Sequence, residues 1–256
     1  MIPKIIHYVW FGRKQFPELT KKCMESWDKY CPDYKLVLWN EDNFDLDSCQ
    51  FAREAYKEKK YAFVSDYVRL EVLYKYGGIY LDTDVELTKN LDEFLNLRAF
   101  SGFEDEKNIP TGIMGCEKEN EVFKELLKYY NDRVFIKVDG TYDMVTNVKI
   151  ITDQLSTKGF IPNNKLQVVE GFTLYPSDFF CPINPINGIV TITENTHAIH
   201  HFSGSWLSVE QREDLENRRK LVQRYGKEIG VFLFRVEKYI THPIQLIKFF
   251  LKRRPS

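Results

Sequence analysis

The sequence is poor in cysteine and contains no long apolar run. Its five cysteines are odd in number and no Cys-X-X-Cys pair occurs, so neither a disulfide framework nor a zinc site is expected. The scattered cysteines fit a reducing cytosol. Because no stretch of about 18 apolar residues occurs, a membrane-spanning helix is not expected either.

An excess of charge of one sign is also absent. Lysine and arginine number 36, aspartate and glutamate 37, and the net charge is −1. Nucleic-acid-binding domains are normally basic, so the composition argues against a nucleic-acid partner. With 43% hydrophobic residues in a chain of 256, a substantial core can form as one domain with additions.

Residues 77–84 contain the most informative pattern, an apolar run that ends in Asp82 and Asp84. Two glycines indicate a turn, and residues 79–81 are typical of a short buried strand. Such a strand delivers both aspartates at its carboxyl end, where open α/β sheets bind ligands. Alternate strand residues point to one side, so both carboxylates can converge on one divalent cation such as Mg²⁺ or Mn²⁺. A turn or a helix N-cap explains the same pair without any function.

The preceding segment, residues 61–76, has the apolar pattern of a largely buried helix. Asp66 and Arg69 are three residues apart and therefore share one helix face. A charged pair in so apolar a helix costs several kcal/mol unless the charges are paired or used. The pair is either structural or directed into the same cleft as the two aspartates, where Arg69 would meet a phosphate and Asp66 would accept sugar hydroxyls.

Residues 65–69 together with residues 76–84 resemble glycosyltransferase family 32, the Asp-X-Asp sugar transferases. This family is related to yeast initiating mannosyltransferases and bacterial capsular polysaccharide enzymes, and the glucosyltransferase domains of large clostridial toxins share the pattern. Residues 2–12 are similar to the family's opening strand. The resemblance covers about residues 2–100 and recurs near residue 200. The combination is specific, whereas Asp-X-Asp alone is not.

The resemblance implies a role for each matching residue. Trp10 matches a tryptophan that stacks on the nucleotide base, a contact worth roughly 1–3 kcal/mol. Asp66 and Arg69 match residues that hold the donor sugar and its phosphates, and Tyr80 matches a donor-site tyrosine. Asp82 matches a residue that touches both ribose and metal, and Asp84 matches the more direct metal ligand.

A histidine cluster lies far from this region, with three of the five histidines in residues 196–201. Its spacing resembles the metal-binding segment of related retaining galactosyltransferases, so His201 is the expected third ligand beside Asp82 and Asp84. His200 would point to the other side of a strand and is the weaker candidate. The toxin relatives use a carboxylate and a serine instead, which leaves the assignment open. Trp206 is expected to close over the diphosphate as part of a mobile loop.

Residues 146–154 lie where relatives place groups near the sugar and the acceptor. Asn147 is the candidate donor-binding residue of this segment, with Asp153 and Gln154 as further candidates. An ordinary helix cap explains these residues equally well.

The order of the expected elements predicts an α/β fold with a Rossmann-like nucleotide-binding sheet flanked by helices. The resemblance narrows this prediction to the GT-A fold. Expected strands cover residues 4–9, 34–39, 79–81, 98–103, 112–115, 166–169, 189–192 and 198–202, and expected helices cover residues 17–31, 48–59, 61–76 and 120–131.

The last fifty residues depart from a simple catalytic core. Ser208 and Gln211 form a capping-box signal for a charged helix through about residue 228. Residues 235–256 hold six basic residues against one acidic residue, a net of +5, beside apolar and aromatic ones. This segment either contacts an anionic membrane surface or packs on the core with a solvated basic end. We therefore expect a GT-A catalytic domain over residues 1–206 and a C-terminal helical extension over residues 207–256.

Taken with the resemblance, the sequence predicts a metal-dependent, retaining glycosyltransferase. It would move a hexose from a nucleotide sugar, UDP-linked rather than GDP-linked by analogy with bacterial relatives, to a glycan or lipid-linked acceptor in cell-surface polysaccharide synthesis. Asp66, Arg69 and Asp84 are the expected catalytic group, with Mn²⁺ or Mg²⁺ as cofactor. No carboxylate stands out as a nucleophile, which favours a front-face route in which the departing phosphate helps deprotonate the acceptor hydroxyl.

The expected location is a bacterial cytoplasm, with peripheral contact at the inner face of the membrane. The N-terminus has no apolar signal region of the usual length before the folded pattern begins. A yeast-type Golgi enzyme would need a membrane anchor, which is not found in this sequence.

Two other classes of protein compete with this interpretation. An aspartate-nucleophile phosphohydrolase also has an apolar strand ending in Asp-X-Asp. There the motif usually lies on the first strand, with threonine or a similar residue two positions after the second aspartate, where this chain has Glu86. The other class is a non-catalytic sugar-binding protein on the same fold. All four charged residues of the two motifs are present, which argues against such a binder.

Overall fold

The computed structural model describes residues 1–184, 186–204 and 207–241. The chain divides into two compact units. The first comprises residues 1–183 and 191–206, and the second comprises residues 184–190 and 207–256. The first unit contains both sheets, and the second contains a helical hairpin.

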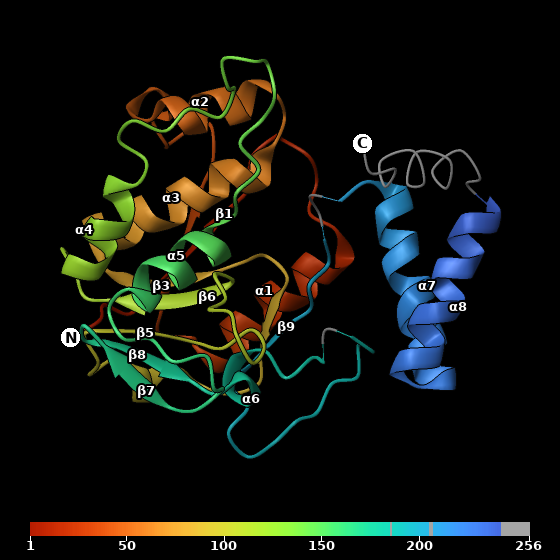
Figure 1. Ribbon diagram of the computed structural model, residues 1–256. Coiled ribbons are helices and arrows are strands. Elements are labelled where there is room, and N and C mark those ends of the chain that lie inside the picture. The colour runs from red at the N-terminus through yellow and green to blue at the C-terminus, as the bar shows by residue number, and fades with distance from the viewer. Residues whose placement is uncertain (185, 205–206, 242–256) are drawn as a thin grey trace. The chain divides into compact units, whose positions relative to one another are not determined.

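A seven-stranded mixed sheet forms the centre of the first unit (Figure 1). β1 is parallel to β2 and β3, β5 is parallel to β8, and the remaining neighbours are antiparallel. The predicted α/β class with a Rossmann-like sheet is thereby confirmed, and the mixed sheet flanked by helices agrees with the predicted GT-A fold. In spatial order the strands are β2 (Lys35–Trp39), β1 (Ile5–Val9), β3 (Gly78–Leu81), β6 (Ile113–Cys116), β5 (Ala99–Gly102), β8 (Phe172–Tyr175) and β7 (Gln167–Val169).

Helices cover both faces of this sheet, because alternate strand residues point to opposite sides. Tyr80 belongs to one apolar core and its neighbours Ile79 and Leu81 belong to the other. The core around Tyr80 includes residues of α2 (Gln50–Lys57), α3 (Tyr61–Tyr76), α4 (Glu121–Lys128) and α5 (Asn147–Ser156). The opposite core includes residues of α1 (Glu18–Tyr30), α6 (Ser177–Phe180) and the short 3-10 turn Asp92–Phe94, while a second such turn, Leu46–Ser48, precedes α2.

A small second sheet pairs β4 (Val85–Leu87) with β9 (Ala198–His200) in antiparallel fashion. The indole nitrogen of Trp27 in α1 donates to the Val85 carbonyl at 2.7 Å. The Leu87 amide donates to the hydroxyl of Ser26 at 2.8 Å. This anchoring of β4 on α1 fixes the place where the distant histidine segment meets the Asp-X-Asp turn.

The sheet has a topological switch point at β1, because β2 and β3 lie on opposite sides of it. Ligands of open α/β sheets bind in the crevice at the carboxyl ends of such strands. β1 ends directly before Trp10, and β3 ends directly before Asp82. The order of the strands therefore brings the ends of the two motif-bearing strands next to each other.

Most predicted elements occur within a few residues of their expected bounds. The strand expected over residues 189–192 is wrong, since no strand is found there among the described residues. β4, β8 and α5 were not predicted as elements. β4 and β8 are three and four residues long, too short to show a clear period, and α5 mixes polar and apolar residues without a sharp period.

The second unit contains α7 (Val209–Tyr225) and α8 (Lys227–Thr241). The predicted capping box is confirmed, since the Ser208 side chain and the Gln211 side chain each bond the other residue's amide. Gly230 allows the two helices to approach closely, because a Cβ there would lie 2.5 Å from the Val222 Cα. No helix of the described residues is both long and apolar enough to cross a bilayer.

His7 in β1 is buried and held in its neutral form by two partners. Its Nε2 lies 2.9 Å from the Gly77 carbonyl, and its Nδ1 accepts from the indole nitrogen of Trp39 at 3.0 Å. Protonation would put a second N–H against the Trp39 donor. Burial, the largest cause, lowers the pKa of His7 to about 4, while the Gly77 carbonyl acts in the opposite sense.

We therefore expect His7 to destabilise the protein in mild acid. Between pH 6.5 and pH 4 the unfolded chain binds a proton at this residue that the folded chain does not bind. The free energy of unfolding should fall across this window as the pH is lowered, by about 3 kcal/mol in total, and should not change further through His7 on either side. Urea unfolding at several pH values checks this, and His7→Gln should lose that part of the slope. A variant that keeps the full slope would contradict the assignment.

Candidate functional site

Asp82 and Asp84 lie on a tight connection between β3 and β4. The Asp82 amide donates to the Gly112 carbonyl at 2.7 Å, and the Asp82 carbonyl accepts from the Val85 amide at 3.0 Å. β3 thus ends against the segment that enters β6, and β4 begins at Val85. The short turn leaves both carboxylates at the carboxyl end of β3.

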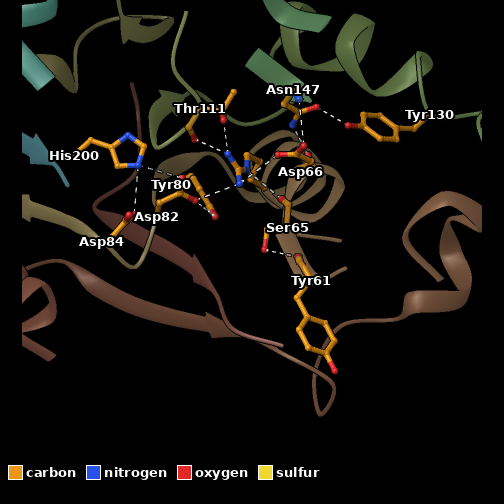
Figure 2. A network of polar contacts seen from close by, with 11 residues as sticks. Tyr61, Ser65, Asp66, Tyr80, Asp82, Asp84, Thr111, Tyr130, Asn147 and His200 are labelled. Atoms are coloured by element: carbon orange, nitrogen blue, oxygen red, sulfur yellow. Dashed lines mark hydrogen bonds and ion pairs between the residues drawn. The ribbon is translucent and has the colours of Figure 1, made fainter. Parts of the chain in front are cut away.

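Each carboxylate has one oxygen held by the protein and one directed at His200 (Figure 2). Asp82 Oδ1 accepts from the Tyr80 hydroxyl at 2.7 Å, and its Oδ2 lies 3.9 Å from His200 Nε2. Asp84 Oδ2 accepts from the Ser203 amide at 2.8 Å, and its Oδ1 lies 3.4 Å from His200 Nε2. One potential ligand atom from each of the three residues lies within 4.8 Å of the others.

The structure places His200, and not His201, beside the two aspartates. In the β4–β9 pair Val85 is opposite His200 and Glu86 is opposite Ile199. Side chains alternate along a strand, so His201 shares the face of Glu86, and its Nε2 lies 2.9 Å from Glu86 Oε2. The structure therefore does not bring His201, the predicted third ligand, to the two aspartates. Alternation alone shows that the two histidines diverge, but only the pairing shows which one meets the carboxylates.

Opposite charges at this cluster stabilise each other. Burial would raise the pKa of Asp84, but the charge of His200 and the Ser203 amide hold that pKa well below its usual range. Burial would likewise lower the pKa of His200, but Asp84 and Cys181 raise that pKa well above its usual value. The imidazolium thus compensates buried negative charge that would otherwise cost several kcal/mol.

The same atoms fit a divalent cation. The two carboxylate oxygens suit both Mn²⁺ and Mg²⁺, and the imidazole nitrogen, in its neutral form, favours Mn²⁺ over Mg²⁺, whose sites use oxygen ligands. Tyr80 and Ser203 orient the carboxylates from outside, which is how outer partners preorganise metal ligands. Gly112 leaves room for the ring, since a Cβ there would lie 2.6 Å from His200 Cε1.

Arg69 is buried between the two acidic motifs. Its Nη2 lies 3.4 Å from Asp66 Oδ1 and 3.2 Å from Asp82 Oδ1. Its Nη1 donates to the carbonyl and the hydroxyl of Thr111, and its Nε donates to the Ser65 carbonyl. The guanidinium therefore links α3 to the Asp-X-Asp turn. Its ion pairs are not confined to Asp66 of its own helix.

Asp66 is nearly fully buried and links α3 to the start of α5. The Asn147 amide donates to Asp66 Oδ2 at 3.2 Å, and the Asn147 side chain bonds both the Asp66 carbonyl and the Tyr130 hydroxyl (Figure 2). Burial raises the pKa of Asp66 to about 6, although Arg69 and the Asn147 amide act to lower it. Asn147 thus lies beside Asp66, while Asp153 is an exposed partner of Lys149.

The two tryptophan predictions have different outcomes. Trp10 lies at the carboxyl end of β1, its indole nitrogen donates to the Lys14 carbonyl at 2.7 Å, and its ring packs against Phe16. No contact among the described residues joins it to the carboxylate cluster. Trp206 lies outside the described residues.

Sequence reasoning missed Glu104, a carboxyl group in the same environment. Glu104 follows β5 by two residues, and its pKa is raised mainly by burial, with the charge of His200 acting to lower it. The charges of Asp105 and Asp82 raise it further. An acidic residue just after a buried strand is the same signal that identified the Asp-X-Asp turn, so the pattern was available in the sequence.

A family model described as the glycosyltransferase sugar-binding region containing the DXD motif matches residues 17–101. Uncharacterized glycosyltransferase L373 of Acanthamoeba polyphaga mimivirus is 29% identical over 203 residues, which cover 71% of this chain and 78% of that protein. Inositol phosphoceramide mannosyltransferase 3 of Schizosaccharomyces pombe is 32% identical over 131 residues, or 50% of this chain and 36% of that protein. The match thus spans about a third of the length of the yeast relative.

Among solved structures, the PaToxG glycosyltransferase aligns with a TM-score of 0.47 and 19% identity, covering 62% of this chain and 70% of that chain. An LgtC mutant structure aligns with a TM-score of 0.41 and 10% identity, covering 82% of this chain and 94% of that chain.

The different placement of the two histidines predicts different effects of their removal. His200→Ala should weaken Mn²⁺ binding by at least about tenfold, because it deletes a potential ligand. His201→Ala removes only the partner of Glu86 and should leave Mn²⁺ binding within about threefold of wild type. Isothermal titration with MnCl₂ measures both variants. Equal losses in the two variants, or a larger loss in His201→Ala, would show that the geometry of β9 does not define the ligand.

Proposed function

We propose that this chain, a glycosyltransferase similar to those of family 32, transfers a hexose from a nucleotide sugar to a glycan or lipid-linked acceptor with the help of Mn²⁺ or Mg²⁺. The proposed donor is a UDP-sugar, and the proposed setting is cell-surface polysaccharide synthesis. The observation that carries the proposal is the convergence of Asp82, Asp84 and His200 at the switch point of the sheet.

The metal would be held by Asp84, Asp82 and His200. When bound, it would supply positive charge that stabilises the diphosphate leaving group, an effect worth several kcal/mol in enzymes that use metals this way. The chain's own residues hold these ligands in place. Tyr80 and Arg69 fix one oxygen of Asp82, and the Ser203 amide fixes one oxygen of Asp84.

The donor sugar is expected at Asp66 and Asn147, next to the same turn. Arg69 forms ion pairs with both Asp66 and Asp82, so a movement of one carboxylate would displace Arg69 and, through it, the other carboxylate. Because Arg69 already bonds several protein groups, we assign it to the positioning of both carboxylates. Trp10 follows the end of β1, the strand next to β3, and this position supports a role for its ring in stacking on the nucleotide base.

A retaining front-face route remains the proposed chemistry. The glycosidic bond to the diphosphate breaks, the acceptor oxygen bonds to the same face of the sugar carbon, and the leaving phosphate takes the acceptor proton. No observation favours the phosphohydrolase alternative. Glu86 stands where that class has threonine or a similar residue, and its carboxylate bonds the side chains of Lys22 and His201.

The donor proposal is tested by thermal unfolding with a panel of UDP- and GDP-sugars, with and without Mn²⁺. A ligand at 100 times its dissociation constant should stabilise the protein by about 2.7 kcal/mol. Asp84→Asn should abolish this stabilisation. Asp33→Asn, at the opposite end of β2 in an exposed pair with Lys4, is the matched control and should keep it.

No stabilisation by any nucleotide sugar would overturn the donor proposal. With the donor identified, NMR of the product tests the route. An α-linked product from an α-linked donor supports retention, and a β-linked product overturns it.

We further propose that the protein works in the cytoplasm at the inner face of a bacterial membrane. In α8, Ile229, Phe232 and Ile240 are 57%, 63% and 73% exposed and share one helix face. The segment from residue 235 onward carries a net charge of +5, six basic residues minus one acidic, which suits an anionic surface. The Schizosaccharomyces pombe relative is named for an inositol phosphoceramide acceptor, and this supports a lipid-linked acceptor.

Membrane contact predicts binding to vesicles of anionic lipid. The protein should co-sediment with phosphatidylglycerol vesicles, bind neutral phosphatidylcholine more weakly, and dissociate as salt is raised. Phe232→Ser with Ile229→Ser should reduce binding several-fold. Val138→Ser, an exposed apolar residue of the first unit, is the control and should not. Absence of binding, or burial of this face in a dimer in solution, would contradict the proposal.

A further inference from the structure

A hollow lies among the helices that cover one face of the large sheet. It is formed by residues at the start of α2, in the middle of α3 and at the end of α4. Its volume is about 380 Å³. None of its lining residues belongs to the cluster of Asp82, Asp84 and His200. The polar and aromatic members of its lining are Ser48, Gln50, Tyr67, Glu71, Tyr130 and Asn131.

Two tyrosine rings form one wall of this hollow. The rings of Tyr67 and Tyr130 meet edge to face, with centroids 5.4 Å apart and an interplanar angle of 60°. Tyr130 is buried, whereas Tyr67 is partly accessible. Aromatic rings in this setting offer an apolar surface with a polar hydroxyl at the edge, which suits a ligand with both C–H and O–H groups.

Glu71 supplies an unsatisfied acceptor in the same hollow. Its Oε2 is buried, and no described residue bonds it. The neighbouring Tyr67 has its pKa raised, first by burial and then by the charge of Glu71. An unpaired buried carboxylate oxygen is unfavourable, so a ligand with hydroxyl donors would gain from bonding it.

The charge of the lining narrows the class of ligand. Among the eight described residues that line the hollow, none is basic and one is acidic. An anionic ligand such as a phosphate or a sugar acid is therefore disfavoured, while a neutral polyol is not. The side-chain amides of Gln50 and Asn131 and the hydroxyl of Ser48 add both donors and acceptors at the rim.

We propose that this hollow is a binding site for a neutral hexose, separate from the donor site. The sugar would place a C–H face against Tyr67 and donate hydroxyl hydrogens to Glu71. The inference rests on the proposed function in one respect, since it identifies the ligand as a sugar unit of the glycan acceptor or product. Binding of a free sugar is nevertheless independent of transfer and of metal.

The hollow is connected to the donor region through Tyr130. The ring of Tyr130 lines the hollow, and its hydroxyl donates to the Asn147 side chain, which in turn bonds Asp66. A sugar held at Tyr67 and Glu71 would therefore lie against the residue that supports the Asp66 network. This connection explains why a glycan-binding site at this place would be useful to a transferase.

The experiment measures sugar binding with the donor site disabled. NMR titration of the Asp84→Asn protein in EDTA uses methyl α-glycosides of mannose, glucose and galactose as probes. At least one should bind with a millimolar dissociation constant. Glu71→Ala should weaken that binding at least about tenfold, because it removes a charged acceptor, and Tyr67→Ala should weaken it as well. Glu125→Ala, an exposed residue of α4 outside the hollow, is the matched control and should have no effect.

Several results would overturn the inference. These are no binding of any of the three glycosides, equal binding by Glu71→Ala and wild type, or Glu71-dependent binding of methylammonium without binding of a sugar. Retained thermal unfolding temperatures in the variants show that they fold. The proposed function is judged separately, since Glu71→Ala with Asp84 intact should keep the Mn²⁺-dependent stabilisation by the nucleotide sugar.

Discussion

The closeness of two carboxylates in a partly buried turn is the constraint on which this structure depends. Asp82 and Asp84 repel each other, and burial strengthens that repulsion unless positive charge is supplied. Two distant segments supply it. Arg69 from α3 bonds Asp82, and His200 from β9 lies 3.4 Å from Asp84. The turn, the buried helix and the histidine strand are therefore three parts of one electrostatic arrangement, which a divalent cation at the same atoms would complete.

The fold places each of these parts from a different direction. The large sheet ends β3 at the turn, the core on one side holds α3 with Arg69, and the core on the other side holds β4 through α1. Because β4 pairs with β9, residues more than a hundred positions apart meet at the carboxylates. α3 carries Asp66 and also carries Tyr67 and Glu71 of the polar hollow, so the donor region and the proposed sugar site share a supporting framework through Tyr130.

Much of the fold could be predicted because its signals are local. The apolar run before Asp82, the buried helix with Asp66 and Arg69, and the capping box at Ser208 all depend on neighbours within a few residues, and each is found in the structure. The strand expected over residues 189–192 shows the limit of such signals, since a short apolar run alone does not show whether a partner strand is available. β4 was missed for the converse reason, because its three residues form a strand only through pairing with β9.

By itself, the sequence determined which chemical groups the site contains, since two aspartates after a buried strand, a charged pair in an apolar helix and a histidine cluster are all visible as patterns. Tertiary structure decided which of those groups meet. The choice of His200 over His201 follows from the register of β9 on β4, and a shift of one residue would exchange their faces. The ion pair of Arg69 with Asp82 and the burial of Glu104 depend in the same way on packing between distant segments. Local patterns carry no information on such distances, because they are set by the pairing and packing of segments far apart in the chain.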